Sequence, residues 1–127
     1  MRNLIKLEEL FLFFLSIFLF SQLGTPWWWF PALFLAPDLG ILGYLAGPRV
    51  GAFSYNLLHH KAIAVTALVL GVYLASLPLQ LAGVIILGHS SLDRVLGYGL
   101  KYPDSFRHTH LGYIGKVPSL GQDGEIP

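Results

Sequence analysis

Residues 35–60 read LAPDLGILGYLAGPRVGAFSYNLLHH, an apolar, glycine-rich stretch that holds ionisable side chains far from the ends of the apolar blocks around it. Asp38 and His59 are the clearest examples, and His89 has a similar position further along the chain. Ionisable groups inside a membrane segment are costly, and they are functional candidates by default. The pattern therefore indicates a polar site inside an apolar protein.

Working outward from this stretch, apolar residues dominate the 127-residue chain, of which 54% is hydrophobic and 12% charged. Four apolar blocks cover residues 7–23, 27–46, 50–75 and 79–96, and a spanning helix needs about 20 residues. Arg2 and Lys6 precede the first block as they would in a signal peptide, but Glu8 and Glu9 interrupt its start and no small-residue cleavage site follows it, which favours a retained helix. The sequence predicts an all-α, four-helix transmembrane bundle over residues 1–118, with a flexible tail over residues 119–127.

Charge and cysteine content exclude several functions. The net charge of +1 is too small to indicate the basic surface that binds nucleic acid. The absence of cysteine excludes disulfides, thiolate metal sites and thiol nucleophiles. All basic residues except Lys61 fall on one side of the four blocks, which predicts a multi-pass membrane protein with cytoplasmic N- and C-termini. The three tryptophans at 27–29 are expected at the outer membrane–water interface, where tryptophan is enriched.

Helix geometry places the polar residues at one depth. Asp38, His59 and His89 lie ten or eleven residues after the positions where their blocks begin, counted from Trp27, Arg49 and Leu79. This is about 15 Å at the α-helical rise, or half of a membrane core. Asp93 follows His89 by four residues and shares its helix face. The residues Gly43, Gly47 and Gly51, spaced by four, fit either close helix packing or a broken helix that exposes backbone to a site.

Histidine and carboxylate side chains at one level suit a divalent metal ion, zinc above all. The predicted ligands are Asp38, His59, His89 and His110, and Asp93 is either a ligand or the general base. Asn56 is placed for a supporting hydrogen bond. His110 enters the set only if the segment after the fourth helix folds back under the bundle. Two alternatives stay open: Asp38 as a helix cap, and Asp93 as an interfacial ion-pair partner.

Two long motifs carry a resemblance to a known family. The stretches LAPDLGILGYLAGPRVGAFSYNLLHH (35–60) and GHSSLDRVLGYGLKYPDSFRHTHLGYIG (88–115) resemble the bacterial membrane family called domain of unknown function 4260. The resemblance covers about residues 7–115 and implies a multi-pass protein of the bacterial inner membrane with four membrane helices and no established activity. Its pattern falls on eight residues here: Asp38, Tyr55, Asn56, His59, His89, Asp93, Arg94 and His110.

Three functional hypotheses follow. The first is a metal-dependent hydrolase acting on a lipid or another amphiphile, in which the metal activates water and Asp93 serves as catalytic base. The second is a non-catalytic small subunit or assembly factor of a larger membrane complex, in which the polar cluster is a hydrogen-bond network. The third is a haem protein with His59 and His89 as axial ligands, against which the nearby carboxylates argue.

Overall fold

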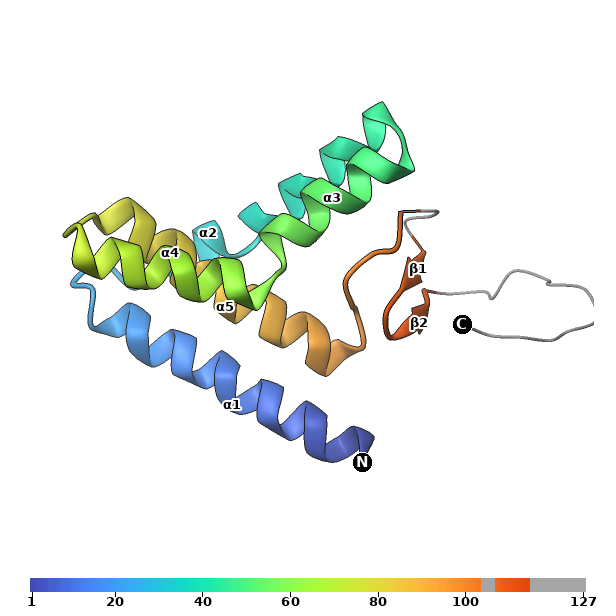
Figure 1. Cartoon of the computed structure of the whole chain (residues 1–127). Coiled ribbons are helices and arrows are strands. Elements are labelled where there is room, and N and C mark those ends of the chain that lie inside the picture. Colours follow the sequence, from blue (N-terminus) through green and yellow to red (C-terminus); the bar gives the residue numbers. More distant parts are fainter. Residues whose placement is uncertain (104–106, 115–127) are drawn as a thin grey trace, which may run out of the picture.

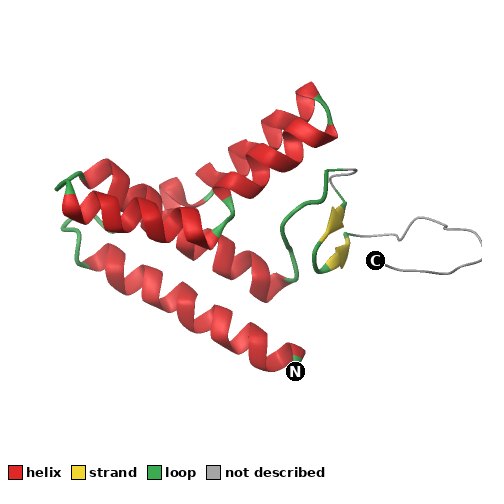
Figure 2. Ribbon diagram, viewed as in Figure 1, coloured by secondary structure: helices red, strands yellow, loops and turns green. Residues whose placement is uncertain are grey.

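The structure is a computed structural model that describes residues 1–103 and 107–114, and its regular structure is mostly helical (Figures 1 and 2). The α-helices are α1 (Arg2–Ser21), α2 (Trp29–Phe34), α3 (Pro48–Leu58), α4 (Lys61–Tyr73) and α5 (Leu77–Leu96). A 3-10 helix, η1 (Ala36–Ala46), lies between α2 and α3. The short strands β1 (His108–Thr109) and β2 (Gly112–Tyr113) form an antiparallel hairpin. The tail predicted at residues 119–127 lies outside the described residues.

Helix α5 is the centre of the molecule, with α1 and α4 packed against it (Figure 1). Its middle is shielded from solvent, since every residue from Gly83 to Ser91 is buried. Its core contacts include Phe20 of α1 and Ala64 of α4. Gly83 permits the close approach of α4, because a Cβ there would lie 2.6 Å from the Ala64 carbonyl oxygen. Packing against α1 and α4 therefore fixes the position of α5, and with it the position of His89.

Helices η1 and α3 form a separate hairpin that leans away from α1, α4 and α5 (Figure 1). Small residues hold the two backbones together. A Cβ on Gly40 would lie 2.8 Å from the Ser54 carbonyl oxygen, and the Ser54 hydroxyl donates a hydrogen bond to the Gly40 carbonyl at 2.6 Å. Gly51 in turn faces the ring of Tyr44. The glycines of this region thus serve close packing, and the packing also fixes the position of η1 beside α3.

Two of the four expected helices are interrupted. Residues 27–46 form α2 and then η1, because Pro37 lacks the backbone donor that a continuous α-helix needs. Residues 50–75 form α3 and α4, and the helix is interrupted at His59 and His60. His60 is extended and its ring Nδ1 accepts a hydrogen bond from the Ala62 N–H at 3.1 Å, which caps α4.

Within the described residues, one helical stretch, Trp29–Ala46, is long and apolar enough to cross a membrane. Helix α4 is apolar but shorter. The four spans therefore stay a prediction. Lys61, the exception among the basic residues, forms a 2.5 Å salt bridge with Glu9, which joins the start of α4 to α1.

After α5 the chain turns back as the sequence suggests. Asn56 on α3 holds this segment by two hydrogen bonds: its Nδ2 donates to the Lys101 carbonyl at 2.7 Å and its Oδ1 accepts the Lys101 N–H at 2.6 Å. Lys101 then pairs with Thr109 in an antiparallel bridge. The β1–β2 hairpin is therefore anchored to the end of α3.

Candidate metal centre

Four ionisable side chains meet where the η1–α3 hairpin joins α5. Asp38 comes from the start of η1, His59 caps the end of α3, and His89 and Asp93 lie one turn apart on α5. One ligand atom from each of the four lies within 4.8 Å of the others. The structure thus brings together three segments that are 21 to 51 residues apart in the sequence.

The four distances between histidine nitrogens and carboxylate oxygens in this cluster are similar. The Asp38 Oδ1 atom lies 3.3 Å from His59 Nε2 and 3.1 Å from His89 Nε2. The Asp93 Oδ2 atom lies 3.4 Å and 3.5 Å from the same two nitrogens. In a tetrahedral site with metal–ligand distances of about 2.0–2.1 Å, neighbouring ligand atoms lie about 3.3–3.4 Å apart. The four histidine–carboxylate distances fall on both sides of that value, and all four ligand atoms lie within 4.8 Å of one another, so the group could hold a metal ion.

Backbone carbonyls fix the orientation of both imidazole rings. His59 Nδ1 lies 2.9 Å from the Tyr55 carbonyl oxygen, and His89 Nδ1 lies 2.6 Å from the Phe34 carbonyl oxygen. A carbonyl only accepts hydrogen bonds, so each Nδ1 carries a proton and donates it. In the neutral ring, Nε2 is then a bare lone pair directed at two carboxylate oxygens. Lone pairs facing carboxylates need a cation or extra protons between them, and this is the arrangement that metal-binding histidines show.

The surroundings shield the histidines more than the carboxylates. The side chains of His59 and His89 are 0% and 3% exposed, whereas those of Asp93 and Asp38 are 16% and 42% exposed. The Tyr55 ring stacks on His59 with centroids 3.8 Å apart. The cluster is therefore enclosed on the histidine side, and Asp38 is its most exposed member.

The residues predicted as supports have three different roles. Tyr55 provides the stacked ring and the carbonyl for His59, and Arg94 donates a hydrogen bond to the His59 carbonyl at 3.2 Å. The Asn56 side chain makes its two hydrogen bonds with the Lys101 backbone and so holds the segment that follows α5. All three therefore stabilise the backbone or ring positions around the cluster.

His110 lies apart from the four-residue group. Its Nδ1 accepts the Leu100 N–H at 2.8 Å, because the β1–β2 hairpin turns it toward the segment that follows α5. Burial and the nearby Arg94 guanidinium lower the pKa of His110, so its ring is neutral at pH 7. The fold-back thus exists, but it brings His110 to a different place from the one the sequence suggested.

Sequence reasoning did not assign two parts of the centre. The Phe34 carbonyl orients His89 but carries no sequence signal, because every residue has a carbonyl. Lys101 is 4% exposed, and its ammonium lies 4.7 Å from the centroid of the Tyr55 ring. Burial lowers the pKa of Lys101 to about 8, and attraction to Asp93 partly opposes this effect. Lys101 thus adds a buried, titratable amine near the carboxylates.

The fold and site define a mostly helical protein with a two-histidine, two-carboxylate cluster able to hold a metal ion. The chain belongs to the family described as domain of unknown function (DUF4260), which matches residues 2–114 and confirms the resemblance of its motifs. No curated protein and no solved structure matches the chain.

Proposed function

We propose that this protein is a membrane metalloprotein that binds one divalent transition-metal ion, most simply zinc, through Asp38, His59, His89 and Asp93. The observation that carries the proposal is the orientation of the two rings. Both Nδ1 atoms donate to backbone carbonyls, which leaves both Nε2 lone pairs facing the same two carboxylates. Imidazole and carboxylate together suit zinc and its neighbours better than calcium or magnesium, which prefer oxygen ligands alone.

The chemistry we propose is hydrolysis of a lipid or another amphiphile. A bound divalent ion supplies a Lewis acid and lowers the pKa of a coordinated water. For hydrolysis we assign Asp93 as the general base in place of a fourth ligand, which would leave one coordination position for water. Its carboxylate lies within 3.5 Å of both Nε2 atoms and is mostly buried on α5. Asp38 is the more exposed carboxylate, so substrate would approach from its side.

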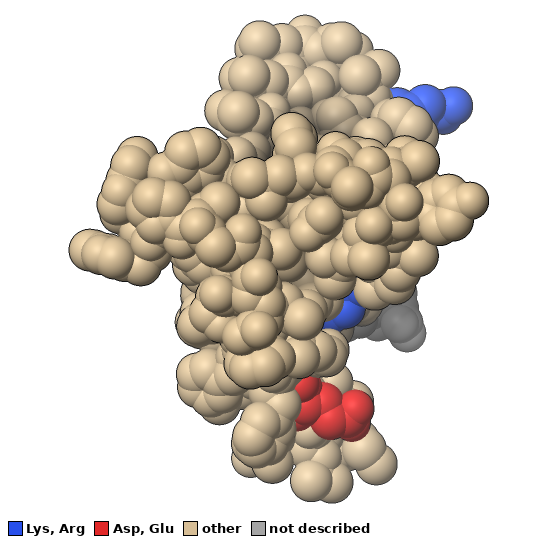
Figure 3. Space-filling view, turned by 90° about the vertical axis from the view of Figure 1, so that its left-hand side faces the viewer, with Lys and Arg blue, Asp and Glu red and all other residues tan. Residues whose placement is uncertain are grey.

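A membrane location with four spans and cytoplasmic termini is part of the same proposal. The outer faces of α1, η1 and α4 carry large exposed side chains such as Phe11, Leu42 and Val69. Figure 3 shows a broad uncharged face whose few charged side chains lie at its top and in its lower half. Soluble monomers rarely expose apolar patches of this extent. Reporter fusions after Thr25 and Ser76 should read as external, and a cytoplasmic signal at either would contradict the topology.

Elemental analysis of the purified, detergent-solubilised protein tests the metal. We expect about one zinc per chain in the wild type, and a strong loss in His59→Asn and Asp38→Asn. His60→Asn is the matched control, because it changes the neighbouring histidine and keeps a residue that caps helices well. Equal metal content in His59→Asn and the wild type would contradict the proposal. His110→Asn should retain the metal, since His110 lies outside the group.

A metal-free network is the second candidate, and the charge balance of the site favours it. Two protonated imidazoles and two carboxylates would neutralise one another, with the cluster fixing the helices of a non-catalytic subunit. This candidate predicts no bound metal in any variant. Haem fits the geometry poorly, because the carboxylate oxygens occupy the space between the two Nε2 atoms that a porphyrin would need.

A further inference from the structure

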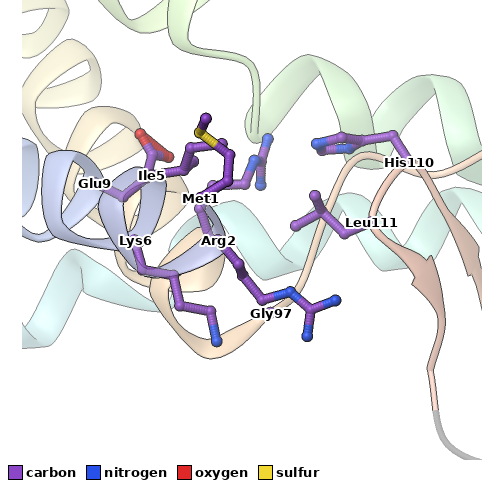
Figure 4. A pocket seen from close by; sticks show the side chains of 9 residues that line it. Met1, Arg2, Ile5, Lys6, Glu9, Gly97, His110 and Leu111 are labelled. Carbon is purple, nitrogen blue, oxygen red and sulfur yellow. The ribbon is translucent and has the colours of Figure 1, made fainter.

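A second polar site lies beyond the metal centre, where α1 begins and α5 ends. A cavity of about 700 Å³ opens there between the first turns of α1, the end of α5 and the turn of the β1–β2 hairpin (Figure 4). Its lining includes the cationic side chains of Arg2, Lys6 and Arg94. None of these residues serves as a ligand in the metal centre, so the cavity needs its own explanation.

The charge of this cavity is unbalanced. Glu9 also lines it, but its carboxylate is already in the salt bridge with Lys61. Among the residues that the structure describes, neither Arg2 nor Lys6 forms a salt bridge. His110 accepts a hydrogen bond at Nδ1, so its neutral ring has a donor at Nε2, and Figure 4 shows the ring pointing into the cavity. Three cations and a neutral donor thus face a space that lacks an available anion.

Arg94 joins the cavity to the metal centre. Its guanidinium donates to the His59 carbonyl at 3.2 Å and to the Tyr98 carbonyl at 3.2 Å, so two backbone groups hold it in place. A guanidinium has five N–H donors, and those two bonds leave further donors for a ligand. An anion bound here would contact the same guanidinium that holds the His59 carbonyl, which connects the cavity to the proposed reaction centre.

The remaining wall of the cavity is apolar. Ile5 and Leu111 line it and are 53% and 52% exposed. Met1 also lines the cavity and is 89% exposed, so the apolar part of the lining is open at the surface. A ligand with an anionic head and an apolar tail would match both parts, since basic pockets beside membrane helices bind anionic lipid head groups.

We infer that this cavity binds the phosphate group of an anionic amphiphile through Arg2, Lys6 and Arg94. The inference deepens the proposed function and rests on it for the substrate class, because it places a phosphoester beside the metal centre. A lipid head group and a soluble phosphate ester share this chemistry. The binding site itself depends on the cavity and its cations, not on the metal.

The test uses the full-length protein in detergent micelles and measures dissociation constants by native mass spectrometry and thermal shift. The probes are dioleoyl phosphatidylglycerol, dioleoyl phosphatidylcholine and glycerol 3-phosphate. We expect tighter binding of the anionic lipid than of the zwitterionic one. Each cation near a membrane surface contributes about a fivefold change, so the double variant Arg2→Gln/Lys6→Gln should weaken anionic-lipid binding by about 25-fold.

Two controls separate this inference from the proposed function. Arg49→Gln changes an exposed cation in the η1–α3 hairpin, away from the cavity, and should bind the lipid as the wild type does. Asp38→Asn should lose metal but keep lipid binding, which distinguishes a failed metal centre from a failed cavity. Binding of glycerol 3-phosphate as tight as that of the lipid would support the phosphate site and assign it to a soluble ester. Equal affinity for both lipids, or wild-type affinity in the double variant, would overturn the inference.

Discussion

Gly40→Ala tests whether the packing of η1 on α3 positions the metal centre. The added Cβ would lie 2.8 Å from the Ser54 carbonyl oxygen and 3.0 Å from the Tyr55 Cα, whereas ordinary contacts begin at 3.4 Å. Both neighbours are backbone atoms, so η1 must move away from α3 by several tenths of an ångström. Asp38 is two residues earlier on η1, and His59 follows Tyr55 by one turn. The shift of η1 therefore moves Asp38 relative to His59 within the metal centre.

The size of the effect follows from this displacement. Overpacking of this kind costs about 1–3 kcal/mol of stability. Functional geometries tolerate errors of about 0.5 Å, so the ligands would be held near the limit of a productive arrangement. We expect zinc affinity to fall by about 10–100-fold, as it does when a supporting contact of a metal ligand is lost. Competition with a fluorescent chelator measures the affinity, and a thermal melt measures the stability.

Gly71→Ala is the matched control for this experiment. Its Cβ would lie 2.6 Å from the Gln80 backbone nitrogen, so it strains the α4–α5 contact to a similar degree but far from the four ligands. We expect a comparable fall in melting temperature with zinc affinity near that of the wild type. If Gly40→Ala loses stability yet keeps wild-type zinc affinity, the hairpin does not position the ligands, and the reasoning fails.

Three further predictions concern stability. Zinc at 100 times its dissociation constant should stabilise the wild type by about 2.7 kcal/mol and raise its melting temperature by about 10 °C, and Asp38→Asn should show no such rise. Because burial lowers the pKa of Lys101 to about 8, the unfolded chain binds more protons between about pH 8 and 10.5, so stability should rise over that window and Lys101→Met should remove the rise in pH-dependent melts. Glu9→Gln should cost about 1–3 kcal/mol by leaving Lys61 half-buried and unpaired, and Glu9→Gln/Lys61→Met should recover much of the loss in denaturant titrations; equal losses in both would contradict this account.

The meeting of Asp38, His59, His89 and Asp93 was accessible from the sequence because helix rise and the four-residue spacing are regular. Three ionisable residues at equal depth in apolar segments are expected to face one another, because facing lipid would be costly. His110 was not accessible in the same way. Its position depends on the β1–β2 hairpin and on a hydrogen bond from the Leu100 N–H, which involve local turn geometry with no periodic signal.

The helix breaks could be predicted only in part. Pro37 signals a break in the second block, and the structure has η1 there. No comparable residue marks the break between α3 and α4. Residues 50–75 contain no proline, and they are mainly apolar on both sides of the two histidines. The break depends on His60 capping α4 through its own ring, an interaction that histidine makes much less often than serine or aspartate.

The adjacent histidines explain why the centre lies where it does. The His60 ring accepts a hydrogen bond from the first turn of α4. Because the His60 backbone is extended, α3 cannot continue past it, and His59 becomes the C-terminal cap of α3. Asp38 and His59 therefore belong to the η1–α3 hairpin, whereas His89 and Asp93 belong to α5 and are fixed by α1 and α4. The hairpin packs mainly within itself, so the four-residue cluster is a principal link between it and α5. An ion bound there would join two separately packed parts of the chain, which ties the geometry of the proposed reaction centre to the orientation of the hairpin.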